Sequence, residues 1–353
     1  MACCDRRLVY FDEWMDPSGR QRAQALEGVQ LVQLSSKNSA QINWQALGTA
    51  HGHQLRPSTE TPKIYYPRGD FFRRCPELLA IASAGAGYDM VDVEACTSAG
   101  VLLFNQTGAN ANSVAQHVLG MMLALSKQLI QSDRAMRSAQ REWTRWDFNG
   151  RELTGRTIGI VGLGNIGSCV AKITGPVFGM RVIAYDPYIS DASFLERGAE
   201  RCGSLEALFS EADFISVNCP LTEETRGMVN GDLFNVMKNT AYFVITARGE
   251  IYDEYALQEV LQAERIAGAG LDVFEREPPP PDHPLLHFEN VIVSPHNAGI
   301  TDDANLNMVI SAIDQWTQVF RGQRPRNLVN PDAWDKFQGR YNECFGSSDA
   351  NWF

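Results

Sequence analysis

Several classes of protein are excluded by what this 353-residue sequence lacks. It has no run of 18 apolar residues, and its first residues, Met-Ala-Cys-Cys-Asp-Arg-Arg, contain no apolar stretch, so neither a transmembrane helix nor a signal peptide is expected. Its eight cysteines form no C-x-x-C pair, and several lie inside apolar runs. We therefore expect a soluble, cytoplasmic protein with reduced thiols, no disulfide and no metal site.

Positive charge is also scarce. The chain has 31 Lys and Arg against 42 Asp and Glu, which gives a net charge of −11. A surface of that sign repels phosphate backbones and anionic lipids, so we expect neither nucleic acid nor a membrane as partner. An anionic small molecule would need a local positive site. The sequence contains neither G-x-S-x-G nor G-x-x-x-x-G-K-[ST], which excludes the corresponding serine hydrolases and P-loop proteins.

The first third of the chain predicts a small α/β domain. Short apolar runs alternate with helical patterns up to about residue 110, which is typical of a parallel sheet. The expected strands begin at Leu8, Val29, Ile64, Leu78 and Val101. His51 and His53 fall in a stretch that we interpret as a polar loop.

A long helix and a second α/β domain are expected next. The helix runs from Ser113 to about Trp143, with Ser113 as N-cap and Gln116 completing a capping box. Six strands then alternate with helical stretches, which fits a doubly wound parallel sheet. They are expected near 157–161, 181–185, 214–217, 242–246, 268–272 and 291–293.

The end of the chain predicts a return to the first domain. A helix over about 301–321 is expected to lead back to it. Six aromatic residues, too many for a free tail, then follow Asp332 and are expected to pack on the first domain or on a partner subunit. The predicted architecture is two Rossmann-like, doubly wound domains with a cleft between them: residues 1–112 with 301–335, residues 113–300, and a tail at 336–353.

A glycine fingerprint in the second domain names a cofactor. Gly162, Gly164 and Gly167 form G-x-G-x-x-G after an apolar run, and Asp186 ends the next apolar run. The first glycine permits the tight turn, the second lets backbone N–H groups approach a pyrophosphate, and the third allows helix and strand to pack closely. Asp186 can accept hydrogen bonds from both ribose hydroxyls and would repel a 2′-phosphate. The pattern predicts NAD rather than NADP.

Three ionisable residues are expected where open α/β sheets bind ligands, just after the carboxyl ends of strands. They are Arg248, Glu277 and His296. Any one of them alone is more often part of a structural ion pair or a helix cap.

Together with the fingerprint, these residues resemble the NAD-dependent D-isomer-specific 2-hydroxyacid dehydrogenases, with phosphoglycerate dehydrogenases as an example. The resemblance runs from about residue 64 to 330. The matching blocks are 83–92, 105–115, 159–167, 212–225, 246–250, 270–278 and 294–301.

The resemblance implies a reaction and its residues. His296 would be the acid/base for the carbonyl or hydroxyl oxygen, and Glu277 would orient it and favour its protonated form. Arg248 would anchor the substrate carboxylate, with backbone N–H groups of Ala86 and Gly87. The first domain would then bind the substrate and the second NAD, in a homodimer joined through its cofactor domains.

The family pattern also implies the cofactor contacts. Asn165 and Ile166 would lie at the pyrophosphate, and Cys219, Pro220 and Thr225 near the adenine half, although packing or capping is an equal alternative for Cys219 and Thr225. Thr246, Asp272 and Gly299 would border the nicotinamide, and Ala247 and His296 complete the implied cofactor contacts.

A few positions distinguish this chain from related dehydrogenases, and one alternative function stays open. Glu277 fits 2-oxoacid chemistry better than the glutamine of formate dehydrogenases, and Ala86 replaces the lysine of phosphite dehydrogenases. Thr107 and Glu250 depart from the common family residues. An alternative function is that of the corepressors of the same fold, which sense NAD(H) and act chiefly by assembling with partners. The other histidines are expected to be structural.

Overall fold

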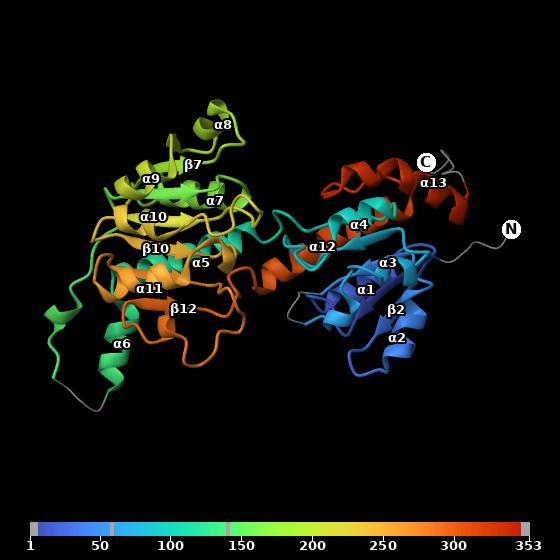
Figure 1. Ribbon diagram of the computed structural model, residues 1–353, viewed down its shortest axis with the longest axis horizontal. Coiled ribbons are helices and arrows are strands. Elements are labelled where there is room, and N and C mark those ends of the chain that lie inside the picture. The colour runs from blue at the N-terminus through green and yellow to red at the C-terminus, as the bar shows by residue number, and fades with distance from the viewer. Residues whose placement is uncertain (1–5, 57–59, 139–141, 347–353) are drawn as a thin grey trace. The chain divides into compact units, whose positions relative to one another are not determined.

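The computed structural model describes residues 6–56, 60–138 and 142–346. The chain divides into two compact units, residues 1–110 with 301–353 (unit 1) and residues 111–300 (unit 2). Each unit contains one parallel sheet with interleaved helices (Figure 1), so the predicted α/β class with two doubly wound sheets is confirmed. Within the described ranges no helix combines the length and apolar character of a membrane span.

The sheet of unit 2 has the strand order of a dinucleotide-binding fold. Its order is β12-β11-β10-β9-β6-β7-β8, and every neighbouring pair is parallel. All six expected strands are present, and the two-residue β8 was not expected. The strands are β6 (Thr157–Val161), β7 (Arg181–Tyr185), β8 (Glu200–Arg201), β9 (Phe214–Val217), β10 (Tyr242–Ile245), β11 (Gly268–Leu271) and β12 (Val291–Val293).

Helices cover both faces of this sheet. Because successive strand residues point to opposite faces, Ile158 and Ile160 belong to one core and Val161 to the other. The first core is covered by α5 (Ala111–Ser126), α7 (Asn165–Thr174) and α8 (Asp191–Glu196). The second is covered by α9 (Leu205–Glu211), α10 (Gly231–Val236) and α11 (Glu254–Gln262).

The prediction of one helix over 113–143 was wrong. α5 ends at Ser126, Gln128 adopts a left-handed conformation with φ 52°, and α6 (Leu129–Arg137) follows as a separate helix. The Ser113 capping box was also wrong, because Ser113 lies inside α5 and its hydroxyl donates to the carbonyl of Ala298. None of the residues of α6 is buried, and this helix lies away from the sheet (Figure 1).

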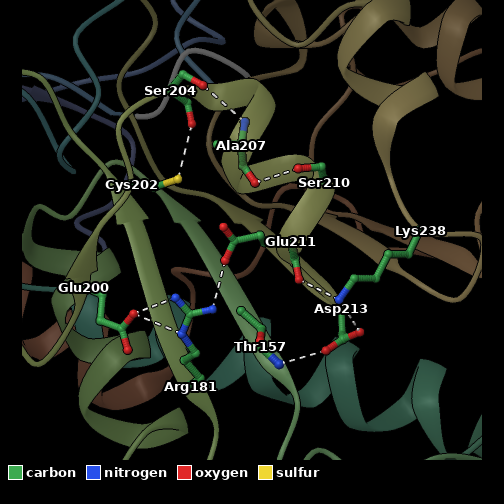
Figure 2. Close-up of polar contacts among 10 residues, drawn as sticks. All are labelled: Thr157, Arg181, Glu200, Cys202, Ser204, Ala207, Ser210, Glu211, Asp213 and Lys238. Carbon is green, nitrogen blue, oxygen red and sulfur yellow. Dashed lines mark hydrogen bonds and ion pairs between the residues drawn. The ribbon is translucent and has the colours of Figure 1, made fainter.

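The amino ends of the strands in unit 2 are braced by charged groups (Figure 2). One oxygen of Asp213 accepts the N–H of Thr157 at 2.9 Å and the other accepts Lys238 Nζ at 3.0 Å. The guanidinium of Arg181 forms two bonds to Glu200 on β8, at 2.7 and 3.0 Å. This edge is opposite to the one that carries the site.

The sheet of unit 1 has the order β2-β1-β3-β4-β5, also parallel throughout. A strand at Ile64 was wrongly predicted, because Lys63–Tyr65 is a 3₁₀ turn between prolines. The missing strand is instead Gly52–Gln54, the stretch interpreted as a polar loop, and His53 is completely buried in it. The strands are β1 (Arg6–Phe11), β2 (Val29–Leu34), β3 (Gly52–Gln54), β4 (Ala80–Ala82) and β5 (Leu102–Phe104).

Two layers of helices enclose this second sheet. α1 (Ser18–Gln24), α12 (Asp302–Phe320) and α13 (Trp334–Phe345) contribute to the core on one face. α2 (Ala40–Leu47), α3 (Phe71–Arg74) and α4 (Val93–Ser98) contribute to the core on the other. The expected aromatic packing of the C-terminal segment is seen in α13, whose Phe337 and Tyr341 are buried in unit 1, whereas Trp352 and Phe353 lie outside the described residues.

Candidate active site

The three ionisable residues follow adjacent strands of unit 2. Arg248 comes after β10, Glu277 after β11 and His296 after β12, so all three lie at the carboxyl edge of the sheet. His296 Nδ1 and Glu277 Oε2 are 2.8 Å apart. The imidazole–carboxylate pair that the family resemblance implied is therefore formed in the tertiary structure.

Opposing effects act on the pKa of the Glu277 carboxyl. Burial would raise its pKa, but the hydrogen bond and charge of His296, the N–H of Phe274 at 3.2 Å and the charge of Arg248 together hold the pKa below its usual value. Glu277 therefore carries a negative charge at neutral pH. The His296 side chain is 40% exposed, so it remains accessible to a ligand.

The loop that carries Arg248 packs tightly against the loop that carries Glu277. A Cβ on Gly249 would lie 1.9 Å from the carbonyl carbon of Phe274, so only glycine fits this contact. Arg248 Nη1 donates to the carbonyl of Ala247 at 2.7 Å. The close backbone contact fixes the distance between the guanidinium loop and the carboxylate loop.

A buried carboxylate shapes the loop that carries His296. Asp272 is 1% exposed, and its two oxygens accept the Ser294 hydroxyl at 2.6 Å and the N–H groups of Asn297 and Ala298 at 2.9 and 3.0 Å. The N–H of His296 donates to the Asp272 carbonyl at 2.8 Å, and His296 adopts φ 53°, a strained value for a residue other than glycine. Asp272 was predicted beside the nicotinamide, and these contacts support it as a structural centre of the same loop.

The glycine fingerprint lies at the point where the strand order of unit 2 reverses, between β6 and β9. Gly162 has φ 85°, and a Cβ there would lie 2.8 Å from the backbone nitrogen of Cys219, which follows β9. A Cβ on Gly167 would lie 2.2 Å from the Gly162 carbonyl oxygen. Among the described residues, nothing lies within 4 Å of a Cβ placed on Gly164, and no side chain caps the N-terminus of α7, which begins at Asn165 and Ile166. This terminus is open to an anion.

Asp186 ends the strand beside the fingerprint. Its oxygens accept the N–H groups of Leu163 and Tyr188, each at 3.0 Å, which ties it to the glycine loop and leaves further lone pairs for hydroxyl donors. Cys219 faces this region, and burial, with a contribution from Asp186, raises the pKa of its thiol to about 12. Cys219 is therefore a neutral packing group rather than a nucleophile.

The remaining predicted cofactor residues differ in what they do. The Thr225 hydroxyl donates to the Pro220 carbonyl at 2.7 Å and accepts the Thr222 N–H at 2.8 Å, which is the capping alternative. Thr246 Oγ1, beside Ala247, is buried without a hydrogen-bond partner among the described residues. Gly299 lies in the turn after His296. The unsatisfied hydroxyl, the open helix terminus and the close glycine contacts fit a dinucleotide.

In unit 1 the glycine-rich turn at 83–87 is held through its carbonyl groups. The Gln106 N–H donates to the carbonyl of Gly85, Asn105 Nδ2 to that of Ala86 at 2.7 Å, and the Ser83 hydroxyl to that of Gly87. Binding the carbonyls in this way leaves the successive N–H groups of Ala86 and Gly87 for an anion.

A small hollow of about 10 Å³ lies beside this turn at the carboxyl ends of β1 and β3. Ala84 belongs to both the turn and the lining. The apolar lining includes Trp14, Leu55 and Met308, and the cation that lines it, Arg56, is already bonded to Glu60 and to the Glu13 carbonyl. Sequence analysis missed these residues because they come from separate segments without a motif. The only signal was their position after strands.

Comparisons with known proteins agree with this geometry. Residues 119–298 match the family model described as D-isomer specific 2-hydroxyacid dehydrogenase, NAD binding domain. The chain is 37% identical over 266 residues to a glyoxylate reductase of Korarchaeum cryptofilum, covering 75% of this chain and 80% of that protein. It is 39% identical over 261 residues to a D-3-phosphoglycerate dehydrogenase of Methanocaldococcus jannaschii, covering 74% of this chain but only about half, 49%, of that longer protein.

A solved structure gives the same result. The D-lactate dehydrogenase of Aquifex aeolicus, determined with NAD and lactic acid, superposes with a TM-score of 0.78 at 26% identity, covering 91% of this chain and 98% of that one. Residues 119–298, which match the family model, contain the glycine fingerprint, Arg248, Glu277 and His296. The strand order, the carboxyl-edge residues and these matches together place the chain in the D-isomer specific 2-hydroxyacid dehydrogenase family, with an NAD-binding domain at 119–298.

Proposed function

We propose that this protein interconverts a small D-2-hydroxy acid and its 2-oxoacid with NAD(H), with unit 2 binding the cofactor and unit 1 the substrate. The single observation that carries the proposal is the 2.8 Å pair of His296 and Glu277 on the same sheet edge as Arg248 and the glycine fingerprint. NAD(H) would supply or accept the hydride, held by Asp186, by the N-terminus of α7 and by the Thr246 hydroxyl.

His296 would transfer the proton. Its Nδ1 is occupied by Glu277, so Nε2 is the ring atom left to face the substrate oxygen. In reduction, Nε2–H would donate its proton to the carbonyl oxygen, and the ionised Glu277 would stabilise the imidazolium before the transfer. In oxidation, the neutral Nε2 would accept the hydroxyl proton. General acid catalysis of this kind is worth about 10²–10⁴ in rate.

The substrate carboxylate needs a local cation, because the chain as a whole carries a net charge of −11. Arg248 can form charge-assisted bonds to a carboxylate with its planar guanidinium. The N–H groups of Ala86 and Gly87 would bind the same carboxylate from unit 1. Glu250, two residues from Arg248, adds a negative charge that would disfavour substrates with a second anion.

The residues around the small hollow in unit 1 disfavour a phosphate group on the 2-oxoacid. Trp14, Leu55 and Met308 offer apolar surface, and Arg56 is already paired, so a phosphate group would find no readily available cation there. We therefore expect a small uncharged 2-oxoacid to be preferred over a phosphorylated one.

A panel of 2-oxoacids with NADH, followed at the absorbance of the reduced nicotinamide, tests the proposal. His296→Ala should lower kcat by about 10²–10⁴ and leave NADH binding intact. Asp186→Ala should weaken NADH binding instead. Full turnover by His296→Ala would reject its role. Absence of turnover on every oxoacid, with NADH still bound, would favour the corepressor-like alternative.

A second copy of the chain is the partner that we propose. α6 has no buried residue, and it exposes Leu129 at 52% and Met136 at 61%, seven positions apart on the same side of the helix. Because α6 belongs to unit 2, a dimer through it would join the cofactor units. Sedimentation of the wild type and of Met136→Glu tests this, and a wild-type monomer would contradict it.

A further inference from the structure

The loop that carries Glu277 is held at two points by one carboxylate, that of Glu254. Residues 274–283 have no regular structure, and Glu277 lies in the middle of them. Glu254, the first residue of α11, accepts the N–H of Glu275 at 2.8 Å through Oε1. Its Oε2 lies 3.0 Å from His283 Nε2. The carboxylate therefore spans the loop from its beginning to its end.

The contact is largely shielded from water. The side chains of Glu254 and His283 are each only 16% exposed, so the pair is screened less than a surface salt bridge. A carboxylate can only accept a hydrogen bond, so this contact places a proton on His283 Nε2. The other ring nitrogen, Nδ1, is buried and has no hydrogen-bond partner among the described residues. The ring also packs edge-on against Phe274 at 5.4 Å.

A tyrosine completes the attachment. The hydroxyl of Tyr252, a residue 3% exposed, donates to the Val273 carbonyl at 3.2 Å and lies 3.4 Å from Glu254 Oε1. Its pKa is raised well above the usual value by burial and by the charge of Glu254, so it stays a donor. The start of the loop is thus fixed by a buried donor, Tyr252, and a largely shielded acceptor, Glu254.

We propose that Glu254, with His283, is a positioning residue for Glu277 and through it for the proton-transfer atom of His296. The inference rests on the proposed function. The Phe274 N–H bond to Glu277 Oε1 depends on the backbone between Val273 and Glu275, which is the part that Glu254 and Tyr252 hold. Removing the Glu254 carboxylate takes away the acceptor of the Glu275 N–H and of the largely shielded ring N–H of His283, so the loop would lose both attachments and shift to satisfy the imidazole with water.

The test is a double-mutant cycle. Glu254→Ala should lower kcat by about 10–100-fold, since a displacement of about 1 Å of a catalytic group has an effect of that order. KM for NADH should change little, because Glu254 has no contact with the fingerprint. In a Glu277→Gln background, Glu254→Ala should lower kcat by less than about 3-fold, because the carboxylate that Glu254 positions is already gone.

Two further variants keep the test independent of folding defects. His283→Phe keeps the ring contact with Phe274 but removes the donor, and it should reproduce part of the loss. Glu259→Gln, on the exposed side of the same helix, is the matched control and should leave kcat unchanged.

A second readout does not need turnover. In ¹⁵N-histidine-labelled protein, the imidazole proton shared by His296 and Glu277 should give a downfield resonance, identified by its absence from His296→Gln. We expect Glu254→Ala to shift or abolish it and Glu259→Gln to retain it. An unmoved resonance, or an undiminished loss of kcat in the Glu277→Gln background, would overturn the inference. If the wild type reduced no 2-oxoacid, the proposed function would fail and this resonance would still decide the inference.

Discussion

Replacing His53 by Leu should stabilise unit 1, and more so in acid. His53 lies in β3, is 0% exposed, and has no hydrogen-bond partner at either ring nitrogen among the described residues. Its neighbours are rings, with Phe11 and Phe71 both at 6.0 Å. Burial lowers the pKa of His53 to about 3, against an ordinary value of 6.5.

The magnitude follows from proton linkage. Between pH 6.5 and 3 the unfolded chain binds a proton at His53 that the folded chain does not, so folding stability is lost as the pH falls through this window. Each pH unit below 6.5 costs about 1.4 kcal/mol, which gives about 2 kcal/mol at pH 5 and almost nothing at pH 8. The unpaired ring nitrogens add roughly 1–3 kcal/mol at any pH, and leucine removes both costs.

Urea unfolding at pH 8 and pH 5 measures the difference. Tryptophan fluorescence reports mainly on unit 1, which holds Trp14, Trp44, Trp316 and Trp334. The free energy of unfolding of His53→Leu should exceed that of the wild type by about 1–3 kcal/mol at pH 8 and by about 2 kcal/mol more at pH 5. His287→Leu, at an exposed histidine, is the control and should show no such increase. A difference in unfolding free energy between His53→Leu and the wild type that is the same at both pH values would refute the reasoning.

Three further substitutions test the packing that supports the two units. Phe337→Ala should cost about 3–5 kcal/mol in chemical unfolding, because this ring is fully buried between α13 and the sheet of unit 1; a cost below about 1 kcal/mol would show that α13 is not part of that core. Gly339→Ala, in the middle of α13 where a Cβ meets nothing within 4 Å, should raise stability by roughly 0.5–1 kcal/mol, and a loss would contradict a helix there. Gly249→Ala should lower both Tm and kcat, because its Cβ would overlap the neighbouring loop, whereas Gly120→Ala on open helix surface should do neither.

The sequence predicted the cofactor unit well because its signals are local. The apolar runs at 157–161 and 181–185 are strands buried on both faces, and such strands can be identified without knowledge of their neighbours. Gly167 is required by a contact within a single turn of chain, with the Gly162 carbonyl, and Gly162 by its φ of 85°. Arg248, Glu277 and His296 were found because each follows a strand, and a parallel sheet brings such positions to one edge.

Other features were decided by packing between distant segments. Gly52–Gln54 has no apolar pattern, yet it is the central strand beside β1 because β1 and β4 supply its hydrogen-bonding partners. The Ser126 carbonyl at the end of α5 accepts the N–H of Arg151, and Glu254 contacts Glu275 and His283, so these contacts also join separate segments.

What the sequence determined by itself is the class of the fold, the dinucleotide fingerprint and the chemical types at the sheet edge, because short-range periodicity and glycine sterics specify them. Only the tertiary structure decided which groups touch: the 2.8 Å pair of His296 and Glu277, the loop that Glu254 holds, and the burial of His53. The hydrogen bonds among them join residues 19 to 29 positions apart, and only the packed fold brings such residues within hydrogen-bonding distance.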